Sequence, residues 1–127
     1  CVVARAAPSS FSIDPRGPPA LFLRANVGPN ASPDSIEARR ARQASPVTHV
    51  SPSDPPFFLI HGEEDDVVPI AHSEAMYAAL REVGVPVQFR RVPDAGHGPG
   101  IVAGPEIAAE IVAWFDKYLW RHAIDPL

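Results

Sequence analysis

The sequence predicts an α/β protein in which three parallel strands carry helices on their faces. Residues 57–60 form a continuous apolar run, and residues 87–92 alternate apolar and polar side chains, as many strands do. Apolar residues at helical spacing follow each run, over residues 75–83 and 105–118. Because strand and helix alternate along the chain, right-handed crossovers and a parallel sheet are favoured.

The chain before residue 57 contains one further strand and an irregular, proline-rich segment. Residues 1–6 are an apolar run that a proline soon ends, which predicts a buried strand. Ten of the sixteen prolines lie within residues 8–56, where each removes a backbone donor and works against long regular elements. Ser32 as N-cap and Pro33 at the first helical position predict a short helix near residues 33–42.

Residues 57–119 follow a regular strand–helix–strand–helix pattern. The strand at residues 57–60 has the composition of a strand covered on both faces, and Gly84 is expected to cap the helix after it. In the strand at residues 87–92, Gln88 and Arg90 alternate with apolar residues, which predicts an edge strand with one solvated face. The last helix is expected to pack on the sheet through one apolar stripe of Ile107, Ala108, Ile111, Val112, Phe115, Tyr118 and Leu119.

Composition and charge exclude several classes of protein. Eleven basic and fifteen acidic residues give a net charge of −4 without a basic block, so nucleic acid is not an expected partner. No apolar run approaches the ~20 residues of a membrane span, so no membrane is expected either. A single cysteine excludes an internal disulfide framework and a cysteine-based zinc site. The compartment, cytoplasmic or secreted, stays open.

Two loops follow the carboxyl ends of the strands at residues 57–60 and 87–92, where ligands gather in parallel sheets. One loop brings several carboxylates, Asp65 among them, and the other brings His97 between glycines. A histidine placed there can act as general base toward a hydroxyl nucleophile. A neighbouring carboxylate would accept its Nδ1–H and stabilise the imidazolium that forms.

Further motifs are Ser45-Pro46-Val47-Thr48-His49-Val50, Pro55-Pro56-Phe57-Phe58-Leu59-Ile60-His61-Gly62, Val68-Pro69, Ser73-Glu74 and Gly84-Val85-Pro86-Val87. Together with Asp65 and His97, which lie 32 residues apart, they resemble the C-terminal third of α/β-hydrolase carboxylesterases. The acetyl-esterase and feruloyl-esterase-like group is the most similar, and prolyl-oligopeptidase-type serine peptidases share the histidine-glycine-x-x-aspartate and glycine-histidine-glycine motifs. The resemblance covers residues 2–119.

The resemblance implies a partial α/β-hydrolase fold whose three strands are the last three of a larger sheet. Residues 1–127 are then the C-terminal segment of one domain, in which residues 8–56 are a proline-rich excursion and residues 57–119 carry the acid and the base. The family's acid falls on Asp65 and its base on His97, and no cofactor is implied.

The sequence departs from the family because it has no glycine-x-serine-x-glycine motif and no histidine-glycine-glycine run for an oxyanion hole. No nucleophile is therefore assigned in this chain. The sequence begins with Cys1 and has Met76 as its single methionine, so a fragment, a processed product and a truncated gene all stay open. Since losing the nucleophile of a serine hydrolase costs on the order of 10⁶ in kcat, we expect little or no esterase activity from these residues alone.

Several residues have competing interpretations. Asp66 is the rival of Asp65 for the acid position, and His61 is expected to be packed or hydrogen-bonded at its strand end. Ser9 and Ser10 follow the strand at residues 1–6 but lack the sharp strand-to-helix turn that holds a nucleophile. The remaining histidines share no metal-ligand spacing, and the acidic loop lacks the pattern of a calcium loop, so no metal site is predicted. These histidines are His49, His72 and His122.

The preferred function is the C-terminal portion of a serine esterase that hydrolyses carboxylic esters of small molecules through an acyl-enzyme. Two alternatives stay open: a serine peptidase of the prolyl-oligopeptidase type, and a non-catalytic α/β module. The strand at residues 1–6 would present an open apolar edge, so a companion chain or self-association through that strand is expected.

Overall fold

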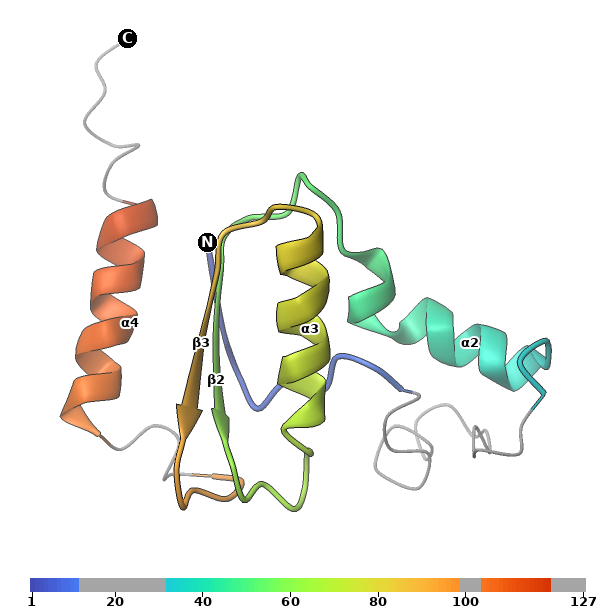
Figure 1. Cartoon of the computed structure of the whole chain (residues 1–127), viewed down its shortest axis with the longest axis horizontal. Helices are drawn as coiled ribbons and strands as arrows, with labels where there is room; N and C mark the ends of the chain where they lie inside the picture. The colour runs from blue at the N-terminus through green and yellow to red at the C-terminus, as the bar shows by residue number, and fades with distance from the viewer. Residues whose placement is uncertain (12–31, 99–103, 120–127) are drawn as a thin grey trace, which may run out of the picture.

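Three parallel strands form the sheet of the described part of this chain, in the order β1-β2-β3 (Figure 1). The computed structural model describes residues 1–11, 32–98 and 104–119. Val2 of β1 is paired with Phe57 of β2, and Phe57 with Val87 of β3. The elements are β1 (Val2–Arg5), α2 (Ile36–Ala44), the 3-10 helix η1 (Pro46–His49), β2 (Phe57–Gly62), α3 (Ala71–Glu82), β3 (Val87–Val92) and α4 (Pro105–Tyr118).

The central strand β2 is buried on both faces, as its unbroken apolar run predicts. Phe58 and Ile60 form the core under α4 together with Ile107 and Trp114, and the rings of Phe58 and Trp114 lie 5.6 Å apart between centroids. The strand β1 differs from the prediction because it is half-buried rather than buried. It lies at the edge of the described sheet, where only one neighbouring strand covers it.

Helices α3 and α4 cover opposite faces of the sheet, and α2 lies beyond α3 (Figure 1). The α3 helix ends as its sequence predicts, although the C-cap residue is Val83 and Gly84 is the residue after it. Gly84 has φ +80°, and its N–H donates to the Arg81 carbonyl while that of Val85 donates to Leu80. This left-handed turn is one that glycine adopts without strain.

The α4 helix begins at Pro105 and ends at Tyr118, but its apolar stripe is divided. Ile107 and Trp114 are buried against the sheet, whereas Val112 and Leu119 are 59% and 55% exposed. The prediction of a single stripe toward the sheet was therefore wrong. The large indole of Trp114 fills the space over Phe58, and the helix presents the face at residues 107, 111, 114 and 118 to the core.

The strand β3 lies at an edge of the described sheet and Gln88 is exposed, as predicted, but both faces also contact a helix. Phe89 contacts Tyr77 of α3, with 5.7 Å between ring centroids. On the other face, Arg90 Nε lies 3.6 Å from the Glu110 carboxylate of α4. Arg90 therefore forms an ion pair with α4 instead of facing solvent alone. Helices cover both faces of this strand, α3 on the side of Phe89 and α4 on the side of Arg90.

The short helix α2 is displaced from its predicted bounds. Ser35, not Ser32, is the N-cap, and its Oγ accepts the N–H of Ala38. The residues before it form a turn, closed by the hydrogen bond from the Ser35 N–H to the Ser32 carbonyl. This turn occupies the positions at which Pro33 was expected to begin the helix. No helix within the described ranges has both the length and the apolar character needed to cross a bilayer.

Candidate active site

The loops after β2 and β3 lie side by side at the carboxyl edge of the sheet. The N–H of Glu63 donates to the Val92 carbonyl and that of Glu64 to the Ala95 carbonyl, each at 3.0 Å. Gly62 makes this approach possible, since a Cβ at its position would lie 2.2 Å from the Ala95 carbonyl oxygen. The two loops that carry Asp65 and His97 are therefore held in direct contact.

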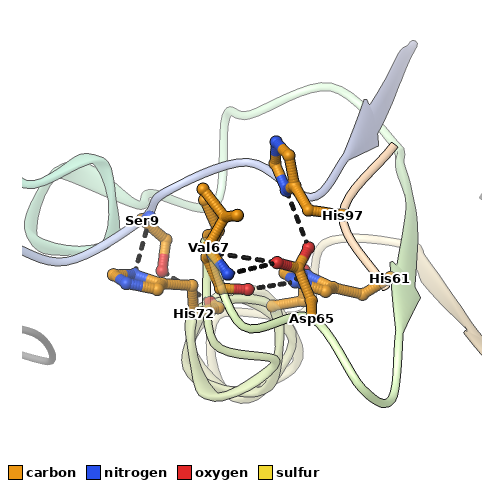
Figure 2. A network of polar contacts seen from close by, with 8 residues as sticks. Ser9, His61, Asp65, Val67, His72 and His97 are labelled. Carbon is orange, nitrogen blue, oxygen red and sulfur yellow. Dashed lines mark hydrogen bonds and ion pairs between the residues drawn. The ribbon is translucent and has the colours of Figure 1, made fainter. Parts of the chain in front are cut away.

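Asp65 has a buried carboxylate whose two oxygens have different partners. Its Oδ1 accepts the backbone N–H groups of Val67 at 3.0 Å and Val68 at 2.8 Å. Its Oδ2 lies 2.9 Å from Nδ1 of His97 (Figure 2). The tight turn after β2 thus fixes one oxygen and leaves the other directed at the histidine.

Opposing effects act on the acidity of Asp65. Burial of the carboxyl raises its pKa, but the hydrogen bond from Val68, the hydrogen bond from His97 and the hydrogen bond from Val67 lower it. The lowering interactions prevail, so the pKa of Asp65 lies below its usual value. The group is accordingly a carboxylate at neutral pH and can act as an acceptor for His97.

His97 is oriented by that carboxylate and open on its other side. Because a carboxylate only accepts hydrogen bonds, the Nδ1 facing it carries a proton, and a neutral ring then has an unprotonated Nε2. The side chain is 39% exposed, while that of Asp65 is fully covered. An accessible basic nitrogen backed by a buried acid is the arrangement that general-base chemistry requires.

Asp66 does not share the position of Asp65, because its residue is exposed while Asp65 faces inward. Ser9 is not placed to act as a nucleophile either. It is buried, and its hydroxyl donates to the His72 carbonyl. Within the described ranges, no group of three or more histidine, cysteine, aspartate or glutamate residues could hold a metal ion.

The structure shows His61 hydrogen-bonded at its strand end, as the sequence predicts, and adds contacts with Asp65 and of His72 that the sequence does not predict. His61 is fully buried and hydrogen-bonded at its strand end, and its Nε2 lies 3.3 Å from the second oxygen of Asp65. His72 Nδ1 accepts the backbone N–H of Ser9 (Figure 2). It also accepts the N–H of Ser10, and both bonds tie the segment after β1 to α3. The four-residue spacing of His61 and Asp65 gives no signal for the first contact, because residues four apart are neighbours on a helix and His61 lies in a strand.

Comparisons with known proteins agree on the kind of fold and differ in the named activity. The family described as the prolyl oligopeptidase family matches residues 24–122. Esterase LipQ of Mycobacterium tuberculosis is 43% identical over 63 residues, which is 49% of this chain. An acetyl ester-xyloside bifunctional hydrolase from Caldicellulosiruptor lactoaceticus is 25% identical, with a TM-score of 0.64 over 92% of this chain. An acylaminoacyl peptidase shares the fold with a TM-score of 0.71 over 92% of this chain, at 21% identity.

The chain spans a minor part of each of these proteins. It covers 15% of the length of LipQ, 42% of the bifunctional hydrolase chain and 19% of the acylaminoacyl peptidase chain. The three parallel strands and their flanking helices therefore correspond to one part of a larger α/β-hydrolase architecture, as the sequence resemblance implies.

Proposed function

The chain belongs to the prolyl oligopeptidase family, and we propose on this basis that it supplies the acid and the base of a serine hydrolase acting on carboxylic esters. The observation that carries the proposal is the 2.9 Å contact between Asp65 Oδ2 and His97 Nδ1, with Oδ1 held separately by two backbone N–H groups. This pairing fixes the tautomer in which Nε2 of His97 is free to take a proton.

In the proposed reaction, His97 Nε2 removes the proton of a serine hydroxyl as its oxygen attacks the ester carbonyl. His97 then gives that proton to the departing alcohol, which leaves an acyl-enzyme, and water repeats the sequence to release the acid. Asp65 remains ionised throughout and stabilises the imidazolium. The serine and the oxyanion-hole donors would come from outside these 127 residues, whose sequence contains no nucleophile elbow.

Esters are favoured over peptides as substrates by two similarities. LipQ is named an esterase, and the Caldicellulosiruptor lactoaceticus protein is named an acetyl ester-xyloside hydrolase. The alternative activity is peptide hydrolysis, which the name of the family itself favours. The third possibility is a non-catalytic α/β module in which the acid and base have no reaction to serve.

The test uses the protein purified by an affinity tag on this chain, together with whatever copurifies with it. Acyl esters of p-nitrophenol and N-acyl amino-acid p-nitroanilides serve as substrates, and a fluorophosphonate probe labels reactive serines. We expect ester hydrolysis that His97→Ala lowers by about 10⁴-fold or more, because removing a triad member leaves only binding and oxyanion stabilisation. Asp66→Asn is the matched control and should leave the rate unchanged.

Faster anilide than ester hydrolysis, still dependent on His97, would favour the peptidase. Absence of both hydrolysis and fluorophosphonate labelling, in a preparation that is folded, would favour the non-catalytic module. Esterase activity that persists unchanged in the His97→Ala variant would overturn the assigned roles.

A further inference from the structure

His61 lies behind the acid of the proposed pair and contacts three groups with its two ring nitrogens. It is the fifth residue of β2 and is fully buried. Its Nε2 lies 3.3 Å from Asp65 Oδ2 (Figure 2). The same nitrogen lies 2.7 Å from the Val68 carbonyl oxygen, and Nδ1 lies 2.7 Å from the Ser73 hydroxyl. A buried ring with every polar atom engaged has one allowed orientation.

The partners of His61 determine which nitrogen is protonated. A backbone carbonyl only accepts hydrogen bonds, so Nε2 carries the proton that the Val68 carbonyl receives. A neutral ring then has a bare Nδ1, which accepts the hydroxyl proton of Ser73. Ser73 is buried in the first turn of α3, so the docking of this helix on β2 sets the tautomer of the ring.

This tautomer places one N–H between the Val68 carbonyl and one oxygen of Asp65. The Nε2–H faces Oδ2, the oxygen that also accepts from His97. It also holds the carbonyl of Val68, the residue whose own N–H binds Oδ1. The opposite tautomer of His61 would direct a lone pair at two acceptors and repel both.

We propose that His61 and Ser73 are positioning residues for the Asp65–His97 pair. Ser73 fixes the tautomer of His61, and the Nε2–H of His61 holds the Asp65 carboxylate in the orientation that keeps the proton of His97 on Nδ1. The inference rests on the proposed function, because it concerns the same acid and base.

The experiment measures the tautomer of His97 directly, without an activity assay. Ring ¹⁵N chemical shifts of the full chain, labelled with ¹⁵N-histidine, report which nitrogen of each neutral imidazole is protonated. We compare His61→Phe, which removes both ring nitrogens, with His61→Gln, which keeps an N–H donor in the side chain. Ser73→Ala removes the hydroxyl, Asp65→Asn removes the acid, and His49→Phe is the control at an exposed histidine outside the site.

We expect His97 to be protonated on Nδ1 in the parent protein and to lose this preference in His61→Phe. Ser73→Ala should show a partial loss, while His61→Gln and His49→Phe retain the parent signals. Merely structural packing by His61 would leave the His97 tautomer unchanged in every variant that folds. An unchanged tautomer in both His61→Phe and Ser73→Ala therefore overturns the positioning role.

Asp65→Asn separates this inference from the proposed function. If that variant leaves the His97 tautomer unaltered, the acid–base pairing itself fails. If it alters the tautomer while the His61 and Ser73 variants do not, the pairing stands and only the positioning role is lost. Far-UV circular dichroism checks folding, and Ser73→Ala alone decides the outcome if the His61 variants do not fold.

Discussion

At the scale of single residues, Asp65 shows how a buried charge is kept ionised. Removing a carboxylate from water is unfavourable, and burial indeed acts to raise its pKa. Two backbone N–H groups and His97 compensate because each interacts better with the charged form than with the neutral acid. The acid is thus stabilised mainly by its own loop, and its remaining oxygen is available to orient the base.

The lowered pKa of Asp65 predicts a pH-dependent contribution to stability. A carboxyl whose folded pKa lies below its unfolded value stabilises the folded state fully above about pH 4 and loses that effect as pH falls through the folded pKa. Urea unfolding of the parent and of Asp65→Asn should therefore show the largest difference in free energy above about pH 4, shrinking on acidification. Asp66→Asn, at an exposed neighbour, serves as control and should show no such trend. A difference that stays constant with pH would contradict this account.

A second residue-scale prediction concerns Gly62. Gly62→Ala would bring a Cβ to 2.2 Å from the Ala95 carbonyl oxygen, so the two loops must separate. We expect a loss of about 1–3 kcal/mol in the free energy of unfolding, as in other overpacked sites. The matched control is Gly96→Ala, whose added Cβ would make an ordinary 3.5 Å contact with the Glu64 carbonyl oxygen. Equal destabilisation of both variants in urea would refute the close-approach explanation.

At the scale of elements, α4 shows what periodicity can and cannot predict. The proline at its start and its apolar spacing were enough to predict residues 105–118 as a helix. They did not identify the face that packs on the sheet, because apolar residues lie on two adjoining faces. The packed face is the one that carries Trp114, whose ring lies tilted against Phe58. This contact spans 56 residues of sequence and depends on the tertiary fold.

Trp114 and Val112 provide a paired test of that orientation. Trp114→Ala should lower the free energy of unfolding by about 3–5 kcal/mol, because the indole is buried in the core. Val112→Ala should change it by about 0.5 kcal/mol or less, since this side chain is exposed on the same helix. Chemical denaturation of both variants measures the difference. Comparable losses would mean that α4 packs through the stripe predicted from the sequence.

In the candidate site too, sequence patterns predict some features, and others depend on tertiary packing. Asp65 and His97 could be singled out from the sequence because their loops follow neighbouring strands and because the order of the motifs resembles a known family. The contact of His61 with Ser73 could not be predicted from the sequence, since it depends on how α3 docks on β2. The N-cap of α2 was misplaced for a local reason: Ser32 and Ser35 are both good caps, and the turn between them selects the second.

At the scale of the whole molecule, β1 has one free edge among the described elements. Its strand neighbour in the described sheet is β2, and the N–H groups of Val2 and Ala6 point toward that strand, to the carbonyls of Pro56 and Ile60. Because N–H groups alternate in direction along a strand, that of Val3 points to the outer side. An apolar strand with outward N–H and C=O groups is a template for pairing with another chain.

We therefore expect the 127 residues, prepared alone, to self-associate through β1 or to bind a companion chain that adds a strand there. Val3→Pro tests this edge, since proline removes the outward N–H of residue 3 and leaves the hydrogen bonds of Val2 and Ala6 with β2 in place. Sedimentation velocity over a concentration series should show association of the parent that weakens in Val3→Pro. Circular dichroism of the same samples controls for loss of the sheet. A stable monomer at all concentrations, with no copurifying partner, would contradict an active edge at β1, because an apolar strand with an unpaired row of backbone groups should then recruit nothing.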